Sequence, residues 1–142
     1  MFVLDTDHLT IIQQHTMPAY DYLLQRVHQH APLAFFVTTI SFHEQVMGWN
    51  AYLSRATTAA AVVRGYERFG RVLANFSTAQ VLPFDDAAAT VFDDLRTRRV
   101  RIGVMDLRIA AIAVARKMTV LTRNVSDFRR VPELKVEDWT LP

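Results

Sequence analysis

Short apolar runs alternate with helical patterns along the whole chain, and this alternation constrains the fold more than any other feature. The strand-like runs lie at 2–5, 34–40, 79–83, 118–122 and, more weakly, 134–139. The helical patterns lie between them at 18–31, 42–54, 57–76, 86–99 and 106–117. Strands separated by helices of this length are joined by right-handed crossovers, which makes them parallel neighbours in one sheet. The sequence therefore predicts an α/β fold, a three-layer α/β/α domain with a central parallel sheet.

Composition and length favour one globular domain spanning residues 1–142. Half of the residues are hydrophobic (51%), and no linker or repeat divides the chain. The absence of cysteine excludes disulfides, thiolate zinc sites and cysteine nucleophiles. No apolar run approaches the roughly 20 residues that a membrane-spanning helix needs. Strand-like sequence begins at Phe2 and a charge follows at Asp5, so we expect a cytoplasmic protein without a secretory peptide.

Acidic residues follow several of the strand-like runs. Four of them stand just past a run or at the start of the helix that follows it: Asp5, Glu44, Asp106 and Asp127. The segments that leave the carboxyl ends of parallel strands meet in one crevice, so these side chains are expected to share a small volume. Carboxylates so close together repel one another unless a hard divalent cation lies between them. The pattern predicts a site for Mg²⁺ or Mn²⁺.

Each of these acids also has an ordinary structural explanation. Ser41 and Glu44 fit a capping box in which Ser41 is the N-cap. Asp5 or Asp7 can cap the short helix after the first strand, and Asp106 can cap a helix or complement its dipole. Asp127 can lie in an exposed turn. Caps need not be acidic, however, because Asn, Ser and Thr serve as well. Four acids at four such junctions therefore favour a shared site.

Several segments together resemble the PIN-domain family, and more narrowly the VapC-type toxins of bacterial toxin–antitoxin pairs. The segments are Leu4-Asp5-Thr6-Asp7, Ser41 to Glu44, Arg101 to Ala111, Leu121 to Phe128 and the tail from Val131 to Trp139. Gly-x-x-Asp-x-x-Ile-Ala-Ala and Thr-Arg-Asn-x-x-Asp-Phe are specific in combination, whereas Asp-Thr-Asp alone is weak. The resemblance covers essentially the whole chain.

The resemblance implies which residues form the site. The family's acidic quartet carries over to Asp5, Glu44, Asp106 and a fourth position, which family members place where either Asn124 or Asp127 stands. We assign the fourth position to Asp127 and keep Asn124 as a candidate water or metal ligand. Asp5, Asp106 and Asp127 are expected to hold one or two Mg²⁺ (or Mn²⁺) ions, while Glu44 completes the cluster or orients the attacking water.

The resemblance also implies the activity. We expect a Mg²⁺-dependent endoribonuclease that hydrolyses single-stranded RNA and is the toxin of a VapBC-type pair. Attack by water leaves a 5′-phosphate and a 3′-hydroxyl. Arg123 and Arg108 are candidates for gripping the RNA backbone, because guanidinium groups suit bidentate phosphate contacts.

The partners implied by the resemblance are a VapB-like antitoxin and a second copy of the chain in a homodimer. An apolar groove along the helical hairpin 42–76 is the expected antitoxin surface, since Phe69, Val72 and Phe76 recur there at helical spacing. Such a stripe is more often plain core, so this expectation rests mainly on the resemblance.

Two other functions are compatible with parts of the pattern. A haloacid-dehalogenase-like phosphatase uses an Asp-x-Asp motif, to which Asp5 and Asp7 correspond, but it also needs a later lysine and an acidic pair. Lys117 precedes its strand, and no clear acidic pair follows Leu121. A non-catalytic RNA-binding module is the second alternative. The acidic set argues against it, because acids repel RNA unless metal neutralises them.

Overall fold

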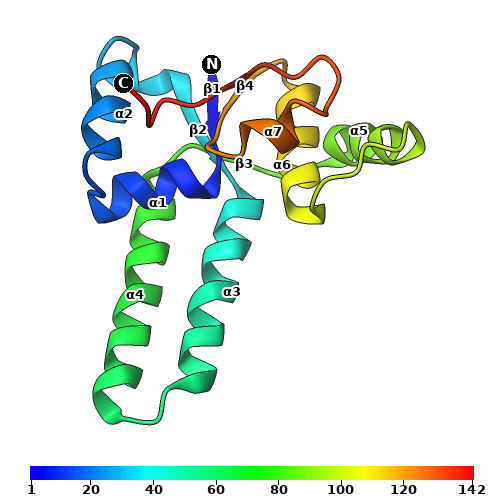
Figure 1. Ribbon diagram of the computed structural model, residues 1–142. Coiled ribbons are helices and arrows are strands. Elements are labelled where there is room, and N and C mark those ends of the chain that lie inside the picture. Colours follow the sequence, from blue (N-terminus) through cyan, green and yellow to red (C-terminus); the bar gives the residue numbers. More distant parts are fainter.

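Five strands form one parallel sheet at the centre of the computed structural model, which describes the whole chain, Met1–Pro142 (Figure 1). The strands are β1 (Phe2–Leu4), β2 (Phe35–Thr38), β3 (Val81–Leu82), β4 (Thr119–Leu121) and β5 (Val136–Glu137). Their order in the sheet is β3-β2-β1-β4-β5, and every neighbouring pair is parallel. The predicted parallel sheet is confirmed, including its weakest strand, and the strands are shorter than the apolar runs that predicted them.

Helices cover both faces of the sheet. They are α1 (Thr6–Gln14), α2 (Ala19–Val27), α3 (Thr39–Arg55), α4 (Ala59–Thr78), α5 (Asp86–Thr97), α6 (Val104–Ala115) and the short α7 (Val125–Phe128), with a 3₁₀ turn at Pro32–Ala34. Successive strand side chains point to opposite faces. Val3 and Val120 accordingly belong to one buried cluster with α5, α6 and α7, whereas Leu4 and Leu121 belong to another with α1, α2 and the base of α4. The predicted three-layer arrangement is confirmed.

The start of α3 differs from the prediction. The Thr38 side chain, at the end of β2, accepts a hydrogen bond from the Ser41 backbone amide at 3.1 Å, and the helix begins at Thr39. Ser41 is therefore a buried residue of the first turn, and the predicted capping box with Ser41 as N-cap is wrong. A threonine that ends a strand is already placed to cap the helix that follows it, and this frees Glu44 for another contact.

The start of α6 also differs. The helix begins at Val104 with Gly103 as N-cap, so Asp106 lies within the first turn and does not cap it. By contrast, Asp5 is the N-cap of α1, and Asp85 is the N-cap of α5. Capping is thus correct for Asp5 and wrong for Asp106, whose position in the first turn fits the other ordinary explanation, that it complements the helix dipole.

The hairpin of α3 and α4 extends away from the sheet (Figure 1). Val72 and Phe76 are buried in the core at its base, where Phe76 packs edge-on against Phe42 with 5.2 Å between ring centroids. These two residues therefore do not line an exposed groove, which corrects the prediction made from their spacing. Exposed apolar side chains of α4 lie elsewhere, at Val62, Val63, Tyr66 and Leu73. No helix combines the length and the hydrophobicity needed to cross a membrane.

Gly65 allows the two helices of the hairpin to approach closely. A Cβ at this position would lie 2.7 Å from Leu53 Cγ and closer still to Leu53 Cδ2, whereas a Cβ at Gly70 would meet nothing within 4 Å. Gly65→Ala is therefore expected to lower the free energy of unfolding by about 1–3 kcal/mol through overpacking. Gly70→Ala should raise it by up to about 1 kcal/mol, because alanine favours the helix. Urea denaturation of both variants tests this, and equal effects would contradict the close packing at Gly65.

Candidate active site

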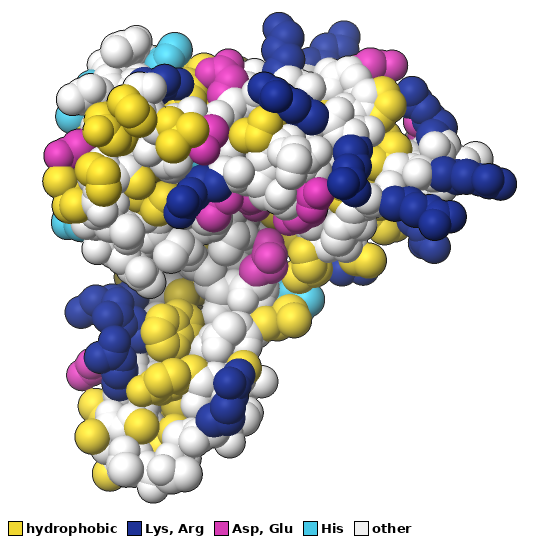
Figure 2. Space-filling model, in the orientation of Figure 1, with side chains coloured by type: hydrophobic (Ala, Val, Ile, Leu, Met, Phe, Trp, Pro, Cys, Tyr) yellow, Lys and Arg dark blue, Asp and Glu magenta, His cyan; other side chains and the backbone are white.

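The predicted acidic side chains come from four places: Asp5 from the end of β1, Glu44 from the second turn of α3, Asp106 from the first turn of α6 and Asp127 from α7. Figure 2 shows acidic side chains grouped near the middle of the face above the hairpin, with basic side chains on both sides. Backbone pairing fixes part of this arrangement, because the Asp5 amide donates to the Leu121 carbonyl at 2.9 Å. The two central strands thereby place Asp5 beside the segment that carries Thr122, Asn124 and Asp127.

Asp5 is the most deeply buried of the four acids. Its side chain is 5% exposed and accepts hydrogen bonds from the Thr6 amide at 2.8 Å and the Thr122 hydroxyl at 2.7 Å. Burial raises the pKa of this carboxyl to about 7, and the negative charges of Asp7 and Asp106 add to the rise. The two hydrogen bonds oppose the rise without cancelling it. Asp5 therefore lies in a place where negative charge is costly.

Glu44 and Asp106 lie near enough to each other for their charges to interact. Glu44 Oε1 accepts a hydrogen bond from the Thr6 hydroxyl at 2.8 Å, a contact that spans two helices. Burial raises the pKa of Glu44, and repulsion from Asp106 raises it further. Burial likewise raises the pKa of Asp106, with smaller contributions from the charges of Asp127 and Asp7. The three carboxyls with raised pKa values thus belong to one electrostatic cluster.

Asn124 joins Asp106 to Asp127. Its side-chain amide nitrogen lies 3.1 Å from Asp106 Oδ2 and 3.1 Å from Asp127 Oδ2, so it donates to both carboxylates. Arg130 Nη2 approaches the other oxygen of Asp127 at 3.8 Å. The structure therefore brings Asp127 to the site beside Asp106, and it places the amide of Asn124 between the two acids.

Asp7 is the site residue that the sequence analysis left outside its acidic quartet. Its oxygens accept from the Arg123 amide at 2.9 Å, the Thr122 hydroxyl at 3.3 Å and the His8 ring at 2.8 Å. Burial opposes ionisation, but the hydrogen bonds from His8 and Arg123 outweigh it and lower the pKa of Asp7. Asp7 is thus a stable anion that fastens the loop after β4 to the start of α1.

His8 connects this network to the C-terminal segment. The fully buried ring accepts from the Trp139 amide at Nε2 (3.2 Å), so Nδ1 carries the proton that is donated to Asp7. Neither His8 nor Thr122 follows a spacing that marks a site in sequence. The only local indication of a role is their position in the sequence, because His8 follows Asp7 and Thr122 precedes Arg123.

The two candidate substrate-binding arginines differ in their surroundings. Arg123 is exposed, and its contact with the acidic network is through its backbone amide. Arg108 is half-buried, and its Nη1 lies 3.6 Å from Met105 Sδ. Neither guanidinium forms an ion pair within the chain, so both remain available to an anionic ligand.

The donor set suits a hydrated cation better than an enclosed one. No group of three or more His, Asp or Glu side chains is placed so that it could hold a metal ion. Mg²⁺ usually keeps several waters and binds proteins through one or two carboxylates together with substrate phosphates. Carboxylates whose pKa values are raised by burial and mutual repulsion, and which have no cationic partner, fit that mode of binding.

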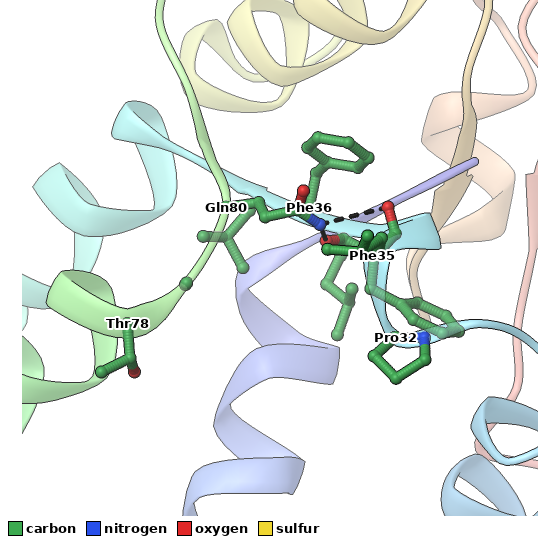
Figure 3. A pocket seen from close by; sticks show the side chains of 9 residues that line it. Pro32, Phe35, Phe36, Thr78 and Gln80 are labelled. Carbon is green, nitrogen blue, oxygen red and sulfur yellow. Dashed lines mark hydrogen bonds between the residues drawn. The ribbon is translucent and has the colours of Figure 1, made fainter.

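A separate hollow lies at the start of β2 and β3, and Figure 3 shows its lining. Its volume is about 360 Å³, and most of its lining is hydrophobic. Gln80 is one of the lining residues, and its side-chain amide donates a hydrogen bond to the carbonyl of Phe35 at 2.8 Å (Figure 3). No carboxylate lines it, so the acidic crevice is the better candidate for chemistry.

Comparison with known proteins identifies relatives of this chain, although no family model matches it. Ribonuclease VapC from Rickettsia bellii is 45% identical over 60 residues, which are 39% of this chain and 45% of that protein. The tRNA(fMet)-specific endonuclease VapC from Salmonella typhimurium is 29% identical over 107 residues, 72% of this chain and 74% of that protein. The first match thus spans less than half of its relative, and the second about three quarters.

Solved structures share the fold across the whole chain. The DNA-bound VapBC complex from Salmonella typhimurium contains a chain with a TM-score of 0.73 at 23% identity, with 97% of each chain covered. VapBC-1 from nontypeable Haemophilus influenzae gives a TM-score of 0.74 at 20% identity, covering 99% of this chain and 98% of that one. The sequence and structure comparisons together confirm the resemblance to VapC-type proteins, and the structures confirm the α/β/α fold.

The raised pKa of Asp5 predicts an unusual dependence of stability on pH. The folded protein keeps the Asp5 proton up to about pH 7, whereas the unfolded chain releases it near the ordinary pKa of 3.8. The resulting stabilisation is complete below pH 3.8 and is lost as the pH rises through 7. In EDTA, we therefore expect wild type to lose up to about 4 kcal/mol relative to Asp5→Asn between pH 4 and pH 8. Urea denaturation at each pH measures this, and parallel curves for the two proteins would contradict the assignment.

The bridging position of Asn124 predicts a second effect. Asn124→Asp replaces two donated hydrogen bonds with a further carboxylate, so the metal-free protein should lose about 1–3 kcal/mol. Mg²⁺ or Mn²⁺ should then raise the thermal midpoint of this variant more than that of wild type. Asn124→Ala is the control, because it removes the same hydrogen bonds without adding charge. A metal response no larger in Asn124→Asp than in Asn124→Ala would count against a cation at this position.

Proposed function

We propose that this chain, a VapC-type PIN domain, is a metal-dependent endoribonuclease that cleaves single-stranded RNA as the toxin of a VapBC-type pair. The observation that carries the proposal is the electrostatic cluster of Asp5, Glu44 and Asp106, three carboxyls with raised pKa values in one crevice. None of the three forms a salt bridge with a lysine or arginine. The relatives named as ribonucleases and endonucleases support the reaction class.

A divalent cation, Mg²⁺ or Mn²⁺, is the proposed cofactor, and Asp5, Asp106 and Asp127 are the residues proposed to hold it, directly or through water. When bound, such an ion supplies Lewis acidity at the phosphoryl group and lowers the pKa of water. The side-chain donors that the protein itself adds to Asp5 and Asp106 are neutral, namely the Thr122 hydroxyl and the Asn124 amide, while the exposed Arg130 approaches only Asp127, at 3.8 Å. The neutral donors orient Asp5 and Asp106 without neutralising them, so these two carboxylates keep their charge for a cation.

Glu44 is the residue proposed to orient the attacking water. Its Oε1 is fixed by the Thr6 hydroxyl, which leaves the second oxygen free to accept from water. Its raised pKa makes it a stronger base than an ordinary glutamate, as a group that receives a proton requires. Arg123 and Arg108 are proposed to contact the RNA backbone. Hydrolysis by water leaves a 5′-phosphate and a 3′-hydroxyl.

The proposed protein partners are a VapB-like antitoxin and a second copy of the chain. The matching solved structures include VapBC complexes from three organisms, which supports the first. The exposed side chains Val63, Tyr66 and Leu73 of α4 offer apolar area for such a contact. The homodimer remains an inference from the resemblance. A cytoplasmic location is proposed from the same resemblance.

The phosphatase alternative is less consistent with the geometry. It requires Asp7 to act as an acid and base, but both oxygens of Asp7 are held by hydrogen bonds from Arg123, Thr122 and His8. Its pKa is lowered, which is the wrong direction for a group that must donate a proton. Asp7 is better suited to hold the site together.

Cleavage should depend on Asp106. We expect wild type incubated with total cellular RNA and Mg²⁺ to create discrete 5′-phosphate ends, and Asp106→Asn to reduce their formation by at least about 100-fold. Excess EDTA should have the same effect as the substitution. Sequencing of the new 5′ ends measures both and identifies the RNA that is cut.

Asp93→Asn is the matched control, because Asp93 is an exposed acid on α5 outside the crevice. It should cut at the same positions and at the same rate as wild type. Cleavage that persists in Asp106→Asn or in EDTA would contradict the proposed chemistry. No cleavage by wild type, combined with trapping of phosphate on Asp5, would instead support the phosphatase.

A further inference from the structure

A basic recess lies where α1 meets the hairpin. Its volume is about 330 Å³, and its lining residues are Gln13, Gln14, His15, Trp49, Arg64, Arg68 and Arg71. The arginines occupy positions i, i+4 and i+7 of α4, so they share one face of the helix and span about 10 Å along its axis. No carboxylate lines the recess. We call these seven residues the arginine recess.

The three arginines of the recess have no charge partners. None forms a salt bridge, although Glu67 lies on the same helix. Like charges spaced four residues apart on a helix repel one another, so this face of α4 is electrostatically unfavourable without a ligand. Figure 2 shows dark blue side chains gathered over the upper part of α4, beside hydrophobic side chains between the two helices. The cluster therefore points to an anion.

Trp49 gives the recess a fixed wall. The guanidinium carbon of Arg68 lies 5.8 Å from the centroid of the indole, in a cation–π contact. Tyr52, three residues further along the same helix α3, supports the indole by packing edge-on against it with 5.4 Å between ring centroids. Arg68 is thus held over an aromatic surface before any ligand arrives, which lowers the entropy lost on binding.

The arginine recess is continuous with the candidate active site. A second cavity, of about 410 Å³, shares Gln13, Gln14 and Trp49 with it and extends to Thr6 and Glu44. Gln13 and Gln45 exchange two hydrogen bonds, at 3.2 and 2.7 Å, along this second cavity. A chain-like ligand that starts at Glu44 can therefore pass over amides and an aromatic ring to reach the arginines.

We propose that the arginine recess is a subsite for the phosphodiester backbone of single-stranded RNA whose scissile phosphate lies at Asp5, Glu44 and Asp106. This assignment rests on the proposed function. The acids repel RNA, so much of the binding energy has to come from basic residues outside the crevice. Guanidinium groups bind phosphate in a bidentate manner, and indole stacks on bases of any sequence. An acidic protein segment matches the charge but does not account for the continuity with Glu44.

Equilibrium binding tests the subsite separately from cleavage. A fluorescent single-stranded RNA of about 20 nucleotides is titrated in EDTA with wild type, with Arg64→Gln/Arg68→Gln/Arg71→Gln, and with a charge-matched control. The control, Arg96→Gln/Arg98→Gln/Arg99→Gln, removes three exposed arginines from the end of α5. The recess variant should bind at least about tenfold more weakly, and its slope of log K against log salt should fall by about 2. The control should bind like wild type.

Two further measurements complete the test. Thermal unfolding checks that the recess variant is folded, and the single variant Arg71→Gln, at an exposed position, provides a milder test of the same prediction. With Mg²⁺, the recess variant should raise KM for long RNA and leave kcat within about twofold of wild type, because the acids are unchanged.

If the recess variant binds RNA as tightly as wild type, the subsite is wrong. The subsite is also wrong if the control variant loses as much RNA affinity as the recess variant. Loss of antitoxin binding with intact RNA binding would identify the recess as a protein interface and would also overturn it. None of these outcomes depends on whether the wild type cleaves RNA. Absence of cleavage by wild type would instead reject the proposed function. The binding measurements in EDTA would still show whether the arginine recess binds RNA.

Discussion

Repulsion among the carboxylates at the carboxyl end of the sheet is the constraint on which the rest of this site depends. Burial raises the free energy of the charged forms of Asp5, Glu44 and Asp106. Neutral groups donate hydrogen bonds to these carboxylates, and no lysine or arginine pairs with them. Hydroxyl and amide groups satisfy the hydrogen-bonding capacity of the acids, yet they leave the net charge unchanged. A lysine in place of one donor would instead neutralise part of this charge and weaken the electrostatic reason for a cation to bind. The choice of neutral donors therefore links the energetics of the fold to its chemistry.

The parallel sheet brings these residues together because β1 and β4 are neighbours at its centre. Leu4 pairs with Leu121 in register, so the residues that follow them, Asp5 and Thr122, leave the sheet side by side. The hydrogen bond between these two side chains joins positions 117 residues apart. The helices begin at these strand ends, which directs their amide-rich first turns toward the crevice. Strand order thus determines which side chains meet, and helix starts determine how they are oriented.

Sequence reasoning succeeded where a pattern is local and failed where a contact is long-range. The five strands and the longer helices followed from apolar runs and periodicity, and the rule that parallel strands share one carboxyl edge was enough to bring the acids together. The hydrogen bond from Thr6 to Glu44 and the buried His8 network were not predictable, because they join positions separated by 38 and 131 residues. Thr38 as the cap of α3 was missed for a different reason. The predicted strand extended to residue 40, so no cap was sought inside it.

The helical hairpin gives the acidic crevice and the arginine recess a fixed separation. Glu44 and Trp49 lie on the same helix, α3, five residues and about 7.5 Å of axial rise apart. The arginines lie on α4, which Gly65 allows to pack closely against Leu53 of α3. A ligand that contacts both regions is therefore held by one rigid element and needs no closure of a loop. The acidic cluster lies near the base of the hairpin, and the three arginines of the recess lie along α4. The carboxylates proposed for catalysis and the guanidinium groups proposed for RNA binding are therefore too far apart to neutralise each other.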